Sequence, residues 1–183
     1  PSWSDKAGVH PAQGETRKRV VLLNGCAQQV LTPQVNEATI RLLTRLGCEV
    51  VVAPDGGCCG SLVLHMGDQD KALASARSNI AAWNRTGPFD AVIANASGCG
   101  TQLKEYGFLL KDDPAWSAAA AEVSAKAKDV SELVGDLLES GSAPPDAPSI
   151  AYHAACSLQH GQKIVAEPAD LLRRAGFVVS NIP

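Results

Sequence analysis

Short apolar runs alternate along the chain with longer segments whose apolar residues recur at helical spacing. The runs RVVLLNGC (19–26), CEVVVAP (48–54) and DAVIANAS (90–97) predict buried strands of a parallel sheet, because strands covered on both faces are apolar throughout. The segments at 32–47 and 68–84, which lie between these runs, predict helices. Strand–helix units in this order predict an α/β fold, with right-handed crossovers and helices on both faces of the sheet.

Residue types at the ends of the segment 32–47 support its assignment as a helix, and one more helix is predicted nearer the C-terminus. Thr32 is a candidate N-cap, Pro33 takes the first helical position, and Gly47 follows the last turn of the same helix. The alanine-rich segment 112–139 is predicted to be helical throughout.

The order of elements near the C-terminus repeats the order near the N-terminus. An apolar run that ends in cysteine (149–156), a helix closed by glycine (166–176) and a further strand (177–183) copy the order of residues 19–54. We therefore expect an internal repeat with pseudo-two-fold symmetry. The second copy stops where its own cysteine doublet should follow.

This organisation predicts three parts of the chain. Residues 1–18, rich in proline, glycine and polar side chains, are expected to be a flexible linker. Residues 19–140 are expected to form a complete lobe, and residues 149–183 the first half of a second lobe. The chain begins with proline and not with methionine, so we expect it to be a piece of a longer protein.

Composition restricts the classes of function. The net charge is −3 and the basic run at 17–19 stands alone, which argues against a nucleic-acid surface. No apolar stretch reaches the roughly 20 residues that span a bilayer, and the polar start lacks the apolar region of a signal peptide. Six cysteines without a secretory signal favour a reducing compartment. We expect a cytoplasmic protein, whose contact with the inner membrane, if any, is peripheral and made through partners.

Candidate chemistry gathers at the ends of the predicted strands. Cys26 ends the first run, Cys58 and Cys59 follow the second, and Cys99 follows the third. Parallel strands place their carboxyl ends at one edge of the sheet, so these thiols are expected to converge there. Adjacent cysteines rarely bridge one another, whereas thiolates in a glycine-rich loop can hold a metal or an inorganic cluster. Burial as a small apolar side chain is the alternative for any one cysteine.

The loop around the cysteine doublet is rich in glycine. Gly56, Gly57 and Gly60 are expected to supply the positive φ angles that let a backbone wrap around a ligand. His65 follows closely and is a candidate fifth ligand, with a surface or capping role as the alternative. Cys48 lies outside the motifs and is expected in the core.

Four motifs together resemble the cysteine-rich, or CCG, domain of heterodisulfide reductase subunits and related iron–sulfur oxidoreductase subunits. They are GC (25–26), GCCG (57–60), ASGCG (96–100) and YHAAC (152–156). The longer stretches LNGCAQQVLTPQVNEATIRLLTRLG, NASGCGTQLKEYG, KDVSEL and YHAACSLQHGQKI are similar to glycolate oxidase iron–sulfur subunits. The resemblance implies two pseudo-symmetric lobes that follow a ferredoxin-like region and receive electrons from a flavin-containing, glycolate-oxidising subunit.

The sequence departs from this family pattern in two places. The ferredoxin-like region is absent and the second lobe ends before its doublet, so the resemblance implies a subunit fragment that is not catalytic alone. Apolar area left open by the missing half-lobe is expected to allow self-association. Ala96 stands where the fuller pattern has the first cysteine of C-x-x-C, which leaves Cys99 and removes one ligand of the five-thiolate cluster of heterodisulfide reductase.

The resemblance implies an electron-transfer domain of a glycolate (2-hydroxy acid) oxidase complex. In this hypothesis Cys26, Cys58, Cys59 and Cys99 hold a [4Fe–4S] cluster that takes electrons from a flavin subunit, and Cys156 serves the intact second lobe. A zinc-binding structural or assembly domain of the same complex is an alternative, because four thiolates also suit tetrahedral zinc. A thiol–disulfide redox module that uses the doublet is a further alternative.

Overall fold

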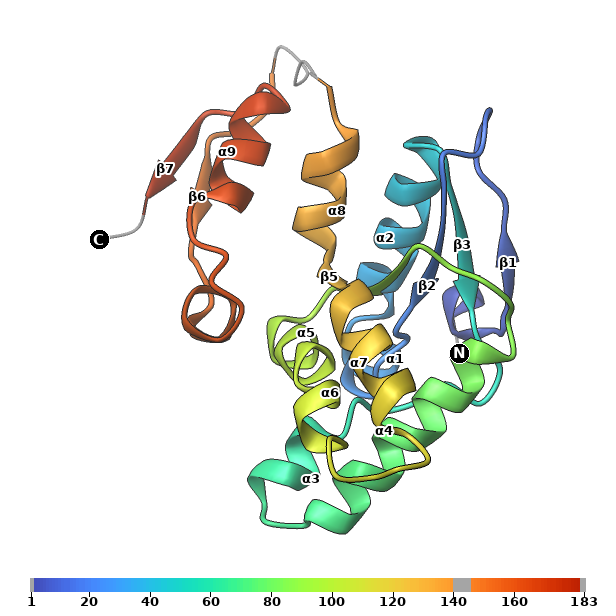
Figure 1. The fold of residues 1–183 in the computed structure, drawn as a ribbon. Coiled ribbons are helices and arrows are strands. Elements are labelled where there is room, and N and C mark those ends of the chain that lie inside the picture. The colour runs from blue at the N-terminus through green and yellow to red at the C-terminus, as the bar shows by residue number, and fades with distance from the viewer. Residues whose placement is uncertain (1, 140–145, 182–183) are drawn as a thin grey trace.

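The computed structural model describes residues 2–139 and 146–181 and shows an α/β fold (Figure 1). Within these ranges the strands form a five-stranded sheet in the order β1-β3-β2-β4-β5 and a separate two-stranded sheet, β6-β7. The strands are β1 (Gly8–His10), β2 (Lys18–Leu22), β3 (Cys48–Val52), β4 (Ala91–Ala94), β5 (Ala127–Asp129), β6 (Ile150–Tyr152) and β7 (Val179–Asn181). In the larger sheet β2, β3, β4 and β5 run parallel, which confirms the predicted fold class.

Helices cover both faces of the larger sheet (Figure 1). The longer ones are α2 (Pro33–Arg45), α4 (Gln69–Asn84), α5 (Ser97–Lys104), α7 (Ser117–Lys126), α8 (Val130–Leu137) and α9 (Glu167–Arg174). The short ones are η1 (Trp3–Asp5), α1 (Ala27–Leu31), α3 (Ser61–His65), α6 (Tyr106–Leu109) and the π-helical turn η2 (Ser157–Gly161). Among the helices of the described ranges, none combines the length and the apolar character that crossing a membrane requires.

Alternate residues of the central strands enter two separate cores. Val21 and Val51 face one side of the sheet, where they pack with residues of α4, α5, α6 and α7, including the fully buried Trp83. Val20 and Val50 face the other side, against α2 and α8. Both faces of each central strand are thus buried, which is why these strands are apolar throughout.

The two parallel strand pairs share several local features. Helix α2 connects β2 to β3, and α9 connects β6 to β7; each helix has proline in its first turn. Gly47 and Gly176, which follow these helices, have φ angles of +84° and +90°. The division into lobes stays a prediction, and residues 140–145 and 182–183, on which its boundaries fall, lie outside the described residues.

The structure corrects the expectation of a flexible linker over residues 1–18. Residues Gly8–His10 form β1, which pairs antiparallel with β3 and puts Val9 opposite Val51. Just before it, η1 carries a capping box between Ser2 and Asp5. A three-residue strand is too short to show alternation, and its pairing is set by the free edge of β3, so the local sequence did not reveal it.

The structure also corrects the expectation of continuous helix over 112–139. Residues 127–129 form β5, which pairs parallel with β4 between α7 and α8. Asp129 then begins α8 with a capping box, because its carboxylate accepts from the Ser131 N–H and its own N–H donates to Glu132. The strand contains Ala, Lys and Asp, which are poor strand formers, and the sheet imposes the extended conformation.

Candidate metal centre

The four cysteines predicted as ligands all lie at the carboxyl edge of the larger sheet. Cys26 follows β2 and is the N-cap residue of α1, and Cys99 lies in the first turn of α5, after β4. Cys58 and Cys59 lie in the loop that connects β3 to α3. The strands β3, β2 and β4 are parallel neighbours, so their following loops emerge side by side.

A contact between two thiols at this edge joins the loop after β3 to the first turn of α5. The Cys59 thiol donates a hydrogen bond to Cys99 Sγ over 3.4 Å, and the Gly60 N–H approaches Cys58 Sγ at 3.5 Å. Cys59 is only 3% exposed, Cys58 and Cys99 are half-buried, and Cys26 is exposed. The cysteine cluster therefore has a buried end at Cys59 and an open end at Cys26.

The pKa shifts show that the cysteines influence one another. The hydrogen bond to Cys99, together with burial, raises the pKa of Cys59, while acceptance of that bond lowers the pKa of Cys99 against the effect of its burial. Burial raises the pKa of Cys26, and the neighbouring Cys58 raises it further. Negative charge on one sulfur opposes negative charge on the next, so a bound cationic group would displace protons from this edge.

The donor set matches a thiolate-bound metal or iron–sulfur group better than it matches a hard cation. Within residues 2–139 and 146–181, however, no group of three or more Cys, His, Asp or Glu side chains is placed so that it could hold a metal ion. The Cys59 thiol contacts Cys99, and Cys26 lies near Cys58. Binding by all four requires their side chains to turn toward a common centre.

Two buried polar side chains hold the backbone of the doublet loop. Asn79 accepts a hydrogen bond from the Gly57 N–H at 2.8 Å and donates to the Cys58 carbonyl at 2.9 Å. Tyr106 donates its hydroxyl to the Cys59 carbonyl at 2.9 Å. The sequence analysis missed both residues, although an asparagine on the apolar face of the alanine-rich helix α4 is a signal that could have revealed one of them.

A network of amide side chains lies beneath the Cys26 loop. Asn36 of α2 donates to the backbone and side-chain oxygens of Asn24, each at 2.9 Å. Asn95, which follows β4, donates to Asn36 at 2.8 Å and accepts from Gln28 at 3.0 Å. These bonds join the segment after β2 to the segment after β4, so the Cys26 loop and the Cys99 loop share one support. Sequence patterns did not single out this network.

The glycines of the doublet loop differ from the expectation. Of the three, only Gly60 has a positive φ, +87°, while Asp55 takes the left-handed conformation at +65°. A Cβ on Gly60 would lie 3.0 Å from the Ala72 carbonyl oxygen, whereas one on Gly57 would meet no atom within 4 Å. The chain turns at Gly60 because α3 begins there against α4. The expected positive φ at Gly56 and Gly57 was wrong.

A surface hollow of about 290 Å³ lies beside the doublet, lined by Gly57, Cys58, Ala74, Ser75, Ser78 and Asn79. His65, the last residue of α3, is exposed, and Cys48 is fully buried in the core against α2 and α8. Solvent therefore reaches the doublet from the side of Cys58.

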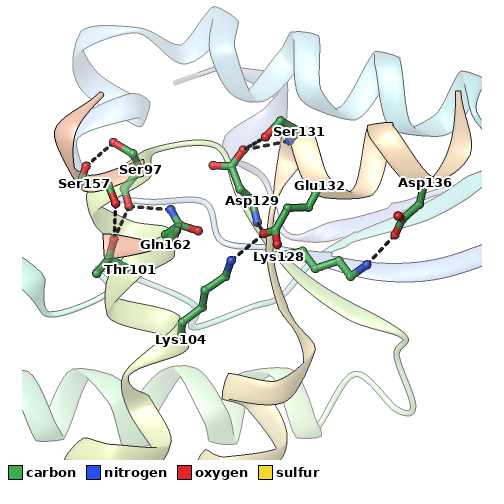
Figure 2. A network of polar contacts seen from close by, with 10 residues as sticks. All are labelled: Ser97, Thr101, Lys104, Lys128, Asp129, Ser131, Glu132, Asp136, Ser157 and Gln162. Carbon is green, nitrogen blue, oxygen red and sulfur yellow. Dashed lines mark hydrogen bonds and ion pairs between the residues drawn. The ribbon is translucent and has the colours of Figure 1, made fainter. Parts of the chain in front are cut away.

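Cys156 follows β6 of the second strand pair. It is exposed and precedes η2, the turn that rests on α5. Figure 2 shows this contact: Ser157 donates its hydroxyl to Ser97 at 2.6 Å, and Thr101 donates to the Ser157 carbonyl at 3.2 Å. Gln162 also donates to the Ser97 carbonyl at 3.0 Å. The helix that carries Cys99 thus supports the segment that carries Cys156.

A second group in Figure 2 fixes α5 against α8. Lys104 of α5 pairs with Glu132 at 2.7 Å, and Glu132 also closes the capping box with Asp129. Lys128 pairs with Asp136 at 2.6 Å further along α8. The helix that begins at the third cysteine loop is therefore held by contacts with both α8 and η2.

The fold and the thiol-lined edge define a cysteine-rich α/β domain. Residues 20–104 match the family described as CCG, cysteine-rich domain.

Several curated proteins are similar to this chain over most of its length. The chain is 41% identical over 185 residues to the glycolate oxidase iron-sulfur subunit of Escherichia coli (strain K12), covering 100% of this chain and 45% of that relative. It is 38% identical over 167 residues to the probable glycolate oxidase iron-sulfur subunit of Bacillus subtilis (strain 168), covering 89% and 37%. Lactate utilization protein A of Exiguobacterium sp. is 29% identical over 154 residues, covering 84% and 62%. The chain spans less than half the length of the first two relatives.

Proposed function

We propose that this chain is an electron-transfer part of the iron–sulfur subunit of a glycolate oxidase complex, in which Cys26, Cys58, Cys59 and Cys99 bind a [4Fe–4S] cluster. The contact between the Cys59 and Cys99 sulfurs carries the proposal, because it joins two of the three cysteine loops at the edge where the third also lies. The names of the Escherichia coli and Bacillus subtilis relatives favour iron over zinc.

The chain's own residues would set how such a group behaves. When bound, a [4Fe–4S] cluster supplies one-electron transfer at a potential set by its ligands, by hydrogen bonds to sulfur and by burial. Cys59 would provide a ligand shielded from water, while Cys26 would provide one at the open end. The Gly60 N–H, already directed at Cys58, would stabilise negative charge on that sulfur.

The proposed electron donor is a flavin-containing subunit that oxidises glycolate. Relatives named for glycolate oxidase and for lactate utilization support a 2-hydroxy acid as the substrate class of the complex, since both acids have a hydroxyl next to the carboxylate.

We place the complex in the cytoplasm, with peripheral attachment to the inner membrane through partner subunits. In this proposal residues 19–140 form a first lobe and residues 149–183 part of a second, with Cys156 as a ligand in the intact second lobe.

Metal analysis of protein purified without oxygen tests this function. Iron, sulfide and zinc would be counted after reconstitution with ferrous iron and sulfide, and the visible absorption would be recorded. We expect about four iron and four sulfide per chain and a thiolate-to-iron absorption band that bleaches on reduction. Stoichiometric zinc without sulfide, or the absence of bound metal in the reconstituted protein, would contradict the proposal.

A further inference from the structure

Asn79 and Tyr106 bind the main chain of three consecutive residues in the doublet loop. The Asn79 side chain accepts from the Gly57 N–H and donates to the Cys58 carbonyl, at 2.8 Å and 2.9 Å. The Tyr106 hydroxyl donates to the Cys59 carbonyl at 2.9 Å and accepts a hydrogen bond from Asn79 at 3.1 Å. The two side chains therefore form one connected unit, which we call the loop clamp.

The loop clamp is buried and its hydrogen bonds are directed at the loop. Asn79 is 1% exposed and Tyr106 is 0% exposed. Burying an amide and a hydroxyl costs free energy unless each finds a partner, and here the partners outside the clamp are the main-chain groups of the doublet loop. Around them α4 and α6 contribute apolar contacts, such as the stacking of Trp83 on Tyr106 with ring centroids 6.4 Å apart.

The bonds of the clamp constrain the main chain that carries both thiols. Gly57 and Gly56 have no side chain to pack, and a glycine-rich loop would otherwise lose much conformational entropy when it becomes ordered. Three hydrogen bonds to successive residues fix that main chain in the folded protein before any ligand arrives. Fixing ligands in advance is what gives a metal site its affinity and specificity.

We infer that Asn79 and Tyr106 are positioning residues, which hold Cys58 and Cys59 in place for the group that the doublet binds. The inference rests on the proposed function for the identity of that group, but the clamp itself can be tested without metal. Its removal should loosen the doublet loop selectively, while leaving the rest of the core closed.

The first experiment measures thiol accessibility in the reduced, metal-free chain. Iodoacetamide labelling at each cysteine is followed by mass spectrometry in the wild type and in Tyr106→Phe, which removes only the hydroxyl. Cys59 and Cys48 are both buried, at 3% and 0% exposure, so Cys48 reports general opening of the fold. We expect labelling of Cys59 to accelerate about fivefold relative to Cys48, as loss of one hydrogen bond would allow.

Matched variants make this result specific. Tyr152→Phe makes the same chemical change on a half-buried tyrosine of β6 and should leave the Cys59 rate unchanged. Asn79→Ala removes the other half of the clamp and should accelerate Cys59 at least as much as Tyr106→Phe. An unchanged Cys59 rate in both clamp variants, or an equal rise at Cys48, would overturn the inference.

The second experiment uses the reconstituted protein. With a cluster bound, Tyr106→Phe should lose iron to a chelator several-fold faster than the wild type and Tyr152→Phe, while the stability of its metal-free form falls by no more than the loss of one hydrogen bond explains. Equal rates of iron loss would overturn the positioning role. If the wild type binds no iron, the proposed function fails, and the labelling experiment still decides whether the clamp exists.

Discussion

The sulfur atoms of Cys59 and Cys99 lie 3.4 Å apart, although 40 positions separate the two residues in the chain. The contact joins the loop after β3 to the first turn of α5, across the intervening β2. The hydrogen bond between them raises the pKa of the donor, Cys59, and lowers the pKa of the acceptor, Cys99.

This pair should close to a disulfide when the metal-free protein is oxidised. Hydrogen peroxide would take two electrons and two protons from the Cys59 and Cys99 thiols, leaving one sulfur–sulfur bond and two water molecules. Peptide mapping without reductant should find the Cys59–Cys99 link in the wild type and lose it in Cys99→Ser. A dominant link to Cys26 or within the doublet would show that the thiols exchange partners freely.

The same pair predicts how thiol reactivity depends on pH. The pKa of Cys99 is lowered, so its thiolate is populated below the usual pH range, whereas the raised pKa of Cys59 keeps that thiol protonated above it. Labelling of the reduced, metal-free chain over a pH series should therefore begin at lower pH for Cys99. In Cys59→Ala, which lacks the donor, the onset for Cys99 should move to higher pH, and a constant onset would contradict the assigned cause.

Substitution of the doublet should remove metal selectively. Cys58→Ser and Cys59→Ser should each lower iron content after reconstitution severalfold or more, because a hydroxyl is a far poorer ligand than a thiolate. Cys48→Ser makes the same change at a fully buried position in the opposite core and should keep its iron, at some cost in stability. If the three variants retain equal iron, Cys58 and Cys59 are not ligands.

A side chain at Gly60 should destabilise the folded protein. Alanine there would adopt a φ of +87° and place its Cβ 3.0 Å from the Ala72 carbonyl oxygen, so Gly60→Ala should lower the free energy of unfolding by about 1–2 kcal/mol or more. Gly57→Ala, with no atom within 4 Å of its new Cβ, should change it by about 0.5 kcal/mol or less. Urea unfolding of both variants measures the difference, and similar losses would refute the structural distinction.

Asp129 should contribute to stability through the start of α8. Asp129→Ala removes the acceptor for the Ser131 N–H and should cost about 1 kcal/mol of unfolding free energy. Asp136→Ala, on the same helix, removes an ion pair whose carboxylate is 52% exposed and should cost about 0.5 kcal/mol or less. Thermal or urea unfolding should therefore rank the two variants, and the reverse order would contradict the capping role.

Continuous apolar runs explain which strands could be predicted from the sequence. Val20, Val50 and Val92 lie in strands that are buried on both faces. Such strands are apolar at every position, so the sequence alone indicates that they are central strands of the sheet. β1 and β5 contain three residues each, and their extended form comes from pairing with β3 and β4. No local pattern could show that.

The candidate site, too, could be predicted only in part. The approach of Cys59 to Cys99 could be expected from topology, because the carboxyl ends of parallel strands lie at a common edge of the sheet. The bonds from Asn79 and Tyr106 could not, since they end on main-chain groups that have no sequence signature. Asn79 was detectable only as a polar residue on an apolar helix face. Many buried asparagines that have a purely structural role show the same pattern.

The position of β1 has a consequence for where this domain can be cut. The family match covers residues 20–104. Strand β1, which pairs with β3, precedes this range. Strand β5 and helices α7 and α8, which complete the sheet and both cores, follow it. A chain trimmed to the matched range would leave the outer edges of β3 and β4 without a partner strand and would remove α7 from one core and α8 from the other. The sheet and its two cores therefore extend beyond the matched range, from β1 through α8.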